Sequence, residues 1–301
     1  MLARIRRFFA RRSVLEVETP LLGAAVNPDP YVEFFTVPDG GRRHYLQTSP
    51  ELAMKRLLAA GSGPIYQIGK AFRRGEIGRL HQPEFTLLEW YRPGFTLDQL
   101  MDEVAALLQA LLPERVAGVT RFTYGEAFRE FTGLSWEAPL SALRSKAEEL
   151  DIPDAARLCG DDRRHWLDLL FSVAVQPRLP ASRLVFVHDY PACMAALARC
   201  KPADPSVAER FEVFVDGVEL GNGYRELTDV EEQRRRFQHD LRLRQRLGQV
   251  VPPLDEDFLA ALAAGMPECS GVAIGLDRVL MVKLGRRRLS DVLTFPLQEP
   301  S

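Results

Sequence analysis

The feature that most constrains the fold of this chain is that its predicted β-strands come in hairpins. Apolar or alternating runs stop at Pro, Gly and Asp residues and then resume, as they do at Asp216-Gly217. Strands joined by short turns pair in an antiparallel way, whereas parallel strands need long crossover connections. The expected pairs are residues 31–37 with 43–48, residues 64–69 with 84–91, and a hairpin within 209–219.

Amphipathic segments between these hairpins predict helices, because their apolar residues recur at helical spacing. The expected helices cover residues 2–12, a segment from Glu51, residues 96–112, 228–247 and 256–264, and a segment after Gly275. Many arginines of the helix at 228–247 are expected to face outward. Hairpin strands covered by helices indicate an α+β fold with an antiparallel sheet flanked by helices.

Residues 113–182 have a shorter and less regular pattern than the rest of the chain. Helical pieces are expected there at residues 140–150 and 164–175. We interpret this segment as a peripheral helical insertion in a single domain that covers residues 1–301.

Composition excludes several classes of protein. The 301 residues include 46% hydrophobic residues, enough for a large core, and a net charge of −2 argues against a surface that wraps nucleic acid. No apolar run reaches about 18 residues, and no apolar segment of a secretory signal follows the basic start, so no membrane span or export is expected. The four cysteines lack the spacing of a zinc site and indicate a reduced, cytoplasmic protein. They are Cys159, Cys193, Cys200 and Cys269.

A strand that leads through Gly275 into a helix beginning near Asp277-Arg278 is a candidate phosphate site. Glycine allows a ligand or a backbone to approach closely. Arg278 opposes the helix dipole at this end, so its position suggests a purpose other than helix stability, and a guanidinium suits bidentate contacts to phosphate. The alternative is an ordinary surface salt bridge.

Three segments resemble the signatures of class II aminoacyl-tRNA synthetases, in the expected order and spacing. They are the first helix and strand up to Pro20, Phe72-Arg73 with the following loop, and Gly271 to Arg278. Other segments resemble the lysyl type in particular: Thr48-Ser49-Pro50-Glu51, Arg79-x-His81-x-Pro83-Glu84-Phe85-Thr86 with Glu89-x-Tyr91, and Glu219 to Leu227. The resemblance runs nearly end to end, and it implies the class II fold and a homodimer formed through the first signature.

This resemblance implies ATP as a substrate, Mg²⁺ as a cofactor, and specific roles for residues. Arg73 and Arg278 are the catalytic candidates, since charge that develops on a phosphate needs preorganised donors. Glu219 is the candidate metal ligand, because Mg²⁺ prefers oxygen ligands. The implied ATP-binding residues are Arg73, Arg74, Gly75, Gln82, Glu219, Leu220, Gly275 and Arg278. The implied amino-acid-binding residues are Ser49, Pro50, Glu51, Tyr91, Glu226 and Ala273.

Two positions depart from the family pattern. Gly75 stands where the second signature usually has glutamate, with Glu76 one place along, and Gln82 stands where related sequences have asparagine. Gly75 leaves the ATP contact of this loop open.

The first signature begins at the first residues, so we expect no N-terminal anticodon-binding domain. That pattern is similar to the elongation factor P–(R)-β-lysine ligase family. The resemblance implies that (R)-β-lysine is activated and joined to a lysine of elongation factor P, with tRNA an unlikely acceptor. Ala273, where lysyl enzymes have glycine, would crowd an α-amino group and favour a β-amino group. The alternatives are a free-standing lysyl-tRNA synthetase-like enzyme and a catalytically inactive, regulatory paralogue.

Overall fold

The computed structural model describes residues 1–297, and the chain divides into two compact units. The first unit consists of residues 1–112 together with the segment from Arg225 onward, and the second consists of residues 113–224. Among the described residues, no helix is both long enough and apolar enough to span a membrane.

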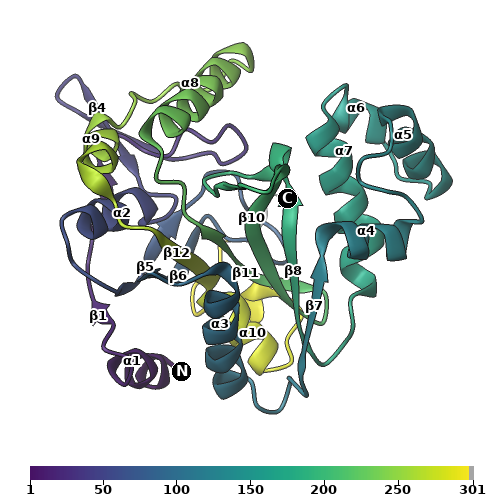
Figure 1. Cartoon of the computed structure of the whole chain (residues 1–301), viewed down its shortest axis with the longest axis horizontal. Helices are drawn as coiled ribbons and strands as arrows, with labels where there is room; N and C mark the ends of the chain where they lie inside the picture. Colours follow the sequence, from purple (N-terminus) through teal and green to yellow (C-terminus); the bar gives the residue numbers. More distant parts are fainter. Residues whose placement is uncertain (298–301) are drawn as a thin grey trace. The chain divides into compact units, whose positions relative to one another are not determined.

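A four-stranded arrangement forms the centre of the first unit, in the order β1-β5-β6-β12 (Figure 1). β5, β6 and β12 are antiparallel neighbours, and the short β1 lies parallel to β5. A smaller sheet has the order β2-β4-β3. The bounds are β1 Leu15–Glu16, β2 Leu22–Gly23, β3 Thr36–Asp39, β4 Arg42–Leu46, β5 Ile65–Phe72, β6 Glu84–Pro93 and β12 Cys269–Gly275.

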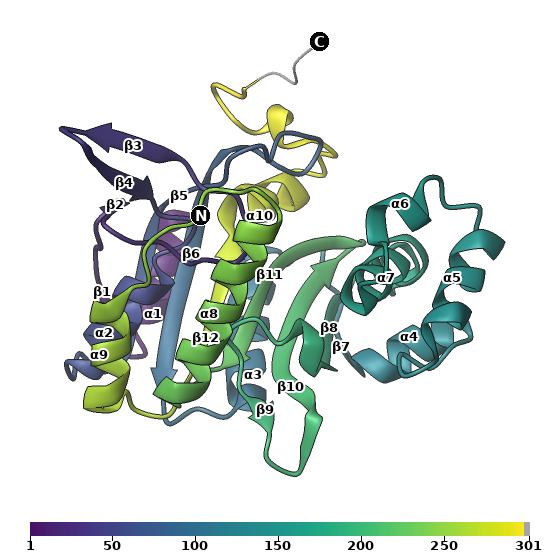
Figure 2. The same ribbon diagram turned by 90° about the horizontal axis from the view of Figure 1, so that it is seen from above.

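Three helices of the first unit, α3, α8 and α9, begin at residues whose side chains cap the helix. α3 starts with a capping box in which Thr96 and Gln99 satisfy each other's backbone amides, and α8 starts at Asp229, whose carboxylate accepts two amides. Figures 1 and 2 both show α9 beside α2. The bounds are α1 Leu2–Ala10, α2 Glu51–Ala59, α3 Leu97–Leu111, α8 Val230–Arg246, α9 Glu256–Gly265 and α10 Leu276–Lys283, followed by a 3₁₀ turn at Leu289–Asp291.

The second unit has its own strands in the order β11-β10-β8-β7, with β9 paired to β10. β7 is parallel to β8, and the other pairs are antiparallel. The strands are β7 Val119–Thr123, β8 Leu184–Pro191, β9 Cys200–Lys201, β10 Asp204–Val215 and β11 Val218–Arg225.

An aromatic core holds the helices of the second unit together, with the ring of Tyr124 stacked on those of Phe128 and Phe171. Figure 2 shows α4 to α7 gathered in one group. The bounds are α4 Tyr124–Thr132, α5 Leu140–Glu149, α6 Ala155–Cys159 and α7 Arg163–Leu170, which continues into a π-helical turn at Phe171–Val175 and a 3₁₀ turn at Gln176–Arg178; a further 3₁₀ turn covers Ala192–Met194.

The α+β prediction is confirmed, although the strands are mixed in direction because β1 and β7 each lie parallel to a neighbour. Two predicted hairpins are also confirmed, β5 with β6 and β10 with β11. The third hairpin is shorter than expected, since residues 31–35 form no strand. The segment 113–182 contains the strand β7, which its weak pattern did not predict.

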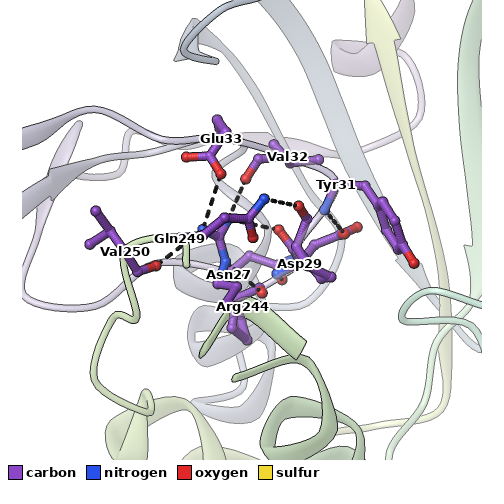
Figure 3. A network of polar contacts seen from close by, with 10 residues as sticks. Asn27, Asp29, Tyr31, Val32, Glu33, Arg244, Gln249 and Val250 are labelled. Atoms are coloured by element: carbon purple, nitrogen blue, oxygen red, sulfur yellow. Dashed lines mark hydrogen bonds and ion pairs between the residues drawn. The ribbon is translucent and has the colours of Figure 1, made fainter. Parts of the chain in front are cut away.

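The outward orientation expected for the arginines of α8 is wrong for Arg244. Its guanidinium is buried and donates to the carbonyl oxygens of Pro28, Asp29 and Val32, as well as to that of Val250 (Figure 3). The same group lies 4.4 Å from the centre of the Phe34 ring. The loop at residues 27–34 forms no strand, and of the carbonyls that Arg244 binds there, that of Asp29 also accepts the amide of Val32. Arg244 therefore supplies donors to backbone carbonyls that no sheet ladder serves.

Candidate active site

One face of the first unit's sheet carries a row of polar and very small residues. Directly opposite residues of antiparallel strands share a face, as do residues two apart along one strand. In β6, Glu89 lies between Gln67 of β5 and Ala273 of β12. Two residues along, Tyr91 lies opposite Gly271 of β12. This set, Gln67, Glu89, Tyr91, Gly271 and Ala273, is called the polar face below.

Gly271 is required by this packing. A Cβ atom there would overlap the ring of Tyr91 and would stand 2.6 Å from Oε1 of Glu226. The absent side chain therefore lets the Tyr91 ring and the Glu226 carboxylate lie directly against β12. Ala273, two residues along, is only partly buried, so its methyl group belongs to the floor of the face.

Glu89 is fixed on the polar face by two hydroxyl groups. Ser49 Oγ donates to Glu89 Oε2 at 2.8 Å, and the Tyr91 hydroxyl donates to Oε1 at 2.6 Å. Ser49 also accepts the amide of Glu51 at the start of α2, which places that helix end beside the face. Burial, together with the negative charge of Glu51, raises the pKa of Glu89 to about 8.

Lys55 joins the two predicted ammonium-binding carboxylates. Its Nζ lies 2.6 Å from Glu51 Oε1 and 2.6 Å from Glu226 Oε2. Burial alone would lower the pKa of Lys55, but Glu226 and Glu51 outweigh it and the pKa is raised, so the ammonium stays charged. Burial also raises the pKa of Glu226 to about 7, and Glu51 contributes to that rise although Lys55 opposes it. One ammonium is thus surrounded by more carboxylate charge than it balances.

Arg73 follows β5 and is held from three sides. Its Nε donates to the Thr48 carbonyl at 3.4 Å, its guanidinium lies 3.7 Å from Glu76 Oε1, and it covers the ring of Phe85. Gly75 has φ of 80°, a left-handed conformation that glycine adopts without strain. Glycine at the position where the resemblance suggests glutamate therefore suits the turn, while Glu76 pairs with Arg73.

Arg278 lies in the first turn of α10, as the sequence predicted. Its Nε donates to the Leu80 carbonyl at 3.1 Å, and a terminal nitrogen lies 2.8 Å from Nε2 of His81. The neighbouring Asp277 accepts the amide of Thr86 at 2.8 Å. These contacts attach the loop between β5 and β6 to the start of α10.

Gln82 and Arg74, both expected to bind ATP, have other partners in this structure. The Gln82 side chain donates to the carbonyl of Leu297 at 3.1 Å and accepts its amide at 2.8 Å. The Arg74 side chain is exposed, and its backbone amide donates to the Glu33 carbonyl at 2.9 Å.

The second unit carries a separate pair of carboxylates. Glu219 lies on β11 beside Leu220, and Glu212 lies on β10. Glu212 pairs with Arg210 and accepts the Tyr190 hydroxyl at 2.7 Å. Burial raises the pKa of Glu212 to about 7; Arg210 opposes this rise and the negative charge of Glu219 adds to it. In the part of the chain that the structure describes, no group of three or more His, Cys, Asp or Glu residues could hold a metal ion.

The structure brings together most of the predicted amino-acid-binding residues. Ser49 and Glu51 at the start of α2, with Pro50 between them as N-cap, adjoin the polar face, and Glu226 lies against Gly271. Sequence reasoning assigned no role to Glu89, Lys55 or Glu212. Glu212 offered a signal, because it is the one charged residue in the run from Phe211 to Val215 that leads to Asp216-Gly217.

Known proteins resemble this chain over nearly its whole length. Residues 1–299 match the family model described as class II tRNA synthetases (D, K and N). The chain is 48% identical over 307 residues to the elongation factor P–(R)-β-lysine ligases of Proteus mirabilis and Photorhabdus laumondii, covering 99% of this chain and 93% of each relative. It is 47% identical over 303 residues to the Vibrio cholerae ligase of the same name, covering 98% and 93% of the two chains. The chain therefore belongs to the class II tRNA synthetase family of the D, K and N type.

Proposed function

We propose that this protein is an elongation factor P–(R)-β-lysine ligase, which activates (R)-β-lysine with ATP and transfers it to a lysine side chain of elongation factor P. Near full-length similarity to three ligases of that name is the observation that carries the proposal. The carboxylates on and beside the polar face support it independently. Glu51, Glu89 and Glu226 offer more negative charge than Lys55 balances, as a substrate with two ammonium groups requires.

The reaction has two steps. In the first, a carboxylate oxygen of (R)-β-lysine attacks the α-phosphorus of ATP, the bond to the β-phosphate oxygen breaks, and pyrophosphate leaves. In the second, the neutral amine of the acceptor lysine attacks the adenylate carbonyl, an amide forms, AMP leaves and the amine loses a proton. Positioning supplies much of the rate in such transfers, so the role of the polar face is to fix the ammonium groups.

Arg73 and Arg278 are the residues we assign to the charge that develops on the α-phosphate. Both guanidiniums are already held by backbone carbonyls, Thr48 for Arg73 and Leu80 for Arg278, so little reorganisation is needed when ATP binds. The full set proposed for ATP is Arg73, Arg74, Gly75, Gln82, Glu219, Leu220, Gly275 and Arg278.

Glu219 and Glu212 are the residues we assign to Mg²⁺. Carboxylate oxygens are the donors that this cation prefers. Burial is the main cause of the raised pKa of Glu212, and the negative charge of Glu219 adds to it, so a divalent cation beside the pair would favour both carboxylates in their ionised form. The bound cation would neutralise charge on the phosphates.

We further propose a cytoplasmic homodimer. Leu15 is an exposed apolar side chain in the segment that resembles the first class II signature, and the exposed Leu21 and Leu22 follow that segment directly, which supports a partner surface there. A cytoplasmic location fits a protein acceptor that works in translation.

A direct test is ATP–pyrophosphate exchange that depends on (R)-β-lysine. Wild-type protein should catalyse the exchange, and Arg278→Ala should lower it by roughly 100-fold or more, since removing a preorganised donor costs that much. Arg242→Ala, an exposed arginine of α8, is the matched control and should keep wild-type exchange. Absence of exchange in the wild type would support the inactive-paralogue alternative.

A further inference from the structure

We propose that Lys55 is a positioning residue that sets how many ammonium groups the site accepts, by holding Glu51 and Glu226 together and balancing one of the three carboxylates around it. This inference rests on the proposed function, because it concerns the same amino-acid site. It gives Lys55, a residue inside α2, a role in binding the amino acid and no role in the chemical steps.

The geometry of Lys55 is that of an internal counter-ion. The Lys55 side chain is completely buried, the Glu226 side chain is 1% exposed, and the Glu51 side chain is 14% exposed. Lys55 therefore reaches the two carboxylates from inside the protein, away from solvent. Glu51 still reaches solvent, so it can pair with Lys55 on one side and with a ligand ammonium on the other.

These contacts determine the net charge of the cluster formed by Lys55 and the three carboxylates. Burial raises the pKa values of Glu89 and Glu226 to about 8 and about 7, so these carboxyls hold protons over part of the neutral range when no ligand is bound. Bound ammonium groups favour the ionised carboxylates. With all three ionised, Glu51, Glu89 and Glu226 supply three negative charges and Lys55 supplies one positive charge, which leaves two negative charges. A ligand with two ammonium groups neutralises the cluster completely. A buried charge without a partner is costly, so a ligand with one ammonium group leaves the site unbalanced.

Other groups around Lys55 do not change this count. Tyr91 is buried and its raised pKa keeps the phenol neutral, and burial likewise raises the pKa of the Cys269 thiol. The titratable groups that act on the cluster are thus Glu51 on α2, Glu89 and Tyr91 on β6, Cys269 on β12, and Glu226.

Lys55 opposes the raised pKa of Glu226, so without Lys55 the Glu226 carboxyl would bind a proton at neutral pH. A ligand ammonium would then have to displace that proton. The loss should therefore appear in the KM for the amino acid and should become smaller at higher pH, whereas the KM for ATP should not change.

The experiment measures (R)-β-lysine-dependent ATP–pyrophosphate exchange at several pH values for Lys55→Met, with Lys55→Gln as a second neutral variant. We expect the KM for (R)-β-lysine to rise roughly tenfold or more at pH about 7, as removal of one partner from a buried charge pair implies, and to fall more steeply with rising pH than in the wild type. The control is Arg56→Met, which removes a cation from the exposed face of the same helix. Its KM should match that of the wild type.

Two outcomes overturn the inference while leaving the proposed function intact. One is a wild-type KM for (R)-β-lysine in both neutral variants. The other is a parallel rise in the KM values for ATP and (R)-β-lysine with an unchanged pH profile, which would mean that Lys55 only supports the fold. Failure of the wild type itself to use (R)-β-lysine would overturn the proposed function instead.

Discussion

Individual side chains set the depth and the charge of the polar face. Gly271 lets Tyr91 and Glu226 lie against the backbone of β12, while Ala273 adds one methyl group to the same floor. Positions 271 and 273 share one face of β12 and differ in a single carbon atom, but they have opposite effects on the space above that face. A single methyl group or a single proton therefore decides which ligand binds at the polar face.

Ala273→Gly should improve the use of α-lysine relative to (R)-β-lysine. Removing the methyl opens space for an amino group at the α-carbon, and one methyl group discriminates between ligands by about 1–3 kcal/mol. The measurement is the ratio of kcat/KM for the two isomers in the exchange reaction. An unchanged ratio would show that this floor position does not select the isomer.

Glu89→Gln should make the stability of the ligand-free protein less sensitive to alkaline pH. The carboxyl of Glu89 has a folded pKa of about 8, raised above its ordinary value, so the folded state holds a proton that the unfolded state has already lost. Stability from this group is therefore present at pH about 4 and is lost as the pH rises toward about 8, by an amount on the order of a few kcal/mol.

The comparison uses the free energy of unfolding of wild type and variant between pH about 5.5 and 8.5. Glu226 and Glu212 also have raised pKa values and contribute a slope of the same sign in both proteins. The slope for Glu89→Gln should be the shallower one. Identical slopes would mean that Glu89 is ionised throughout this range.

Among the elements, α8 stands out because it holds a loop in place through one side chain. Arg244 binds the carbonyls of the loop at residues 27–34, and Gln249 donates to the carbonyl of Pro30 at 3.0 Å (Figure 3). The Glu33 carbonyl in turn accepts the amide of Arg74, in the loop proposed to bind ATP. The side chains of Arg244 and Gln249 bind residues 28–32, and the next residue, Glu33, binds the backbone of Arg74. The C-terminal end of α8 is thereby linked to the loop that contains Arg74.

Arg244→Met should destabilise the protein by roughly 3 kcal/mol or more, because several buried carbonyls lose a charged donor. Denaturant unfolding provides the measurement. Arg246→Met is the matched control, since Arg246 is exposed on the same helix, and it should change stability by less than about 0.5 kcal/mol. Equal effects of the two substitutions would contradict this role for Arg244.

The sequence predicts a feature well when the residues that determine it lie close together in the chain. The hairpins β5–β6 and β10–β11 were predictable from apolar runs and turn residues, and Glu51, Tyr91 and Glu226 could be named from the family motifs. Lys55 could not be recognised, because an amphipathic helix usually exposes its lysines and the carboxylate of Glu226 comes from a distant part of the chain. The buried position of Arg244 could not be predicted either, because its acceptors are backbone atoms of a distant loop.

At the scale of the whole chain, the family match covers residues of both compact units. The polar face belongs to the first unit, and the carboxylate pair of Glu212 and Glu219 belongs to the second. The proposed activity assigns the amino acid to the former and Mg²⁺ to the latter. The proposal therefore names residues of each unit.

The most direct test of the central claim follows labelled (R)-β-lysine to its acceptor. Purified protein is supplied with ATP, Mg²⁺ and the label, and either elongation factor P or bulk tRNA is added, with α-lysine as the comparison substrate. We predict stable label on elongation factor P, stronger with (R)-β-lysine than with α-lysine, and none on tRNA. Label on tRNA but not on the factor would contradict the account and would identify a tRNA-charging enzyme.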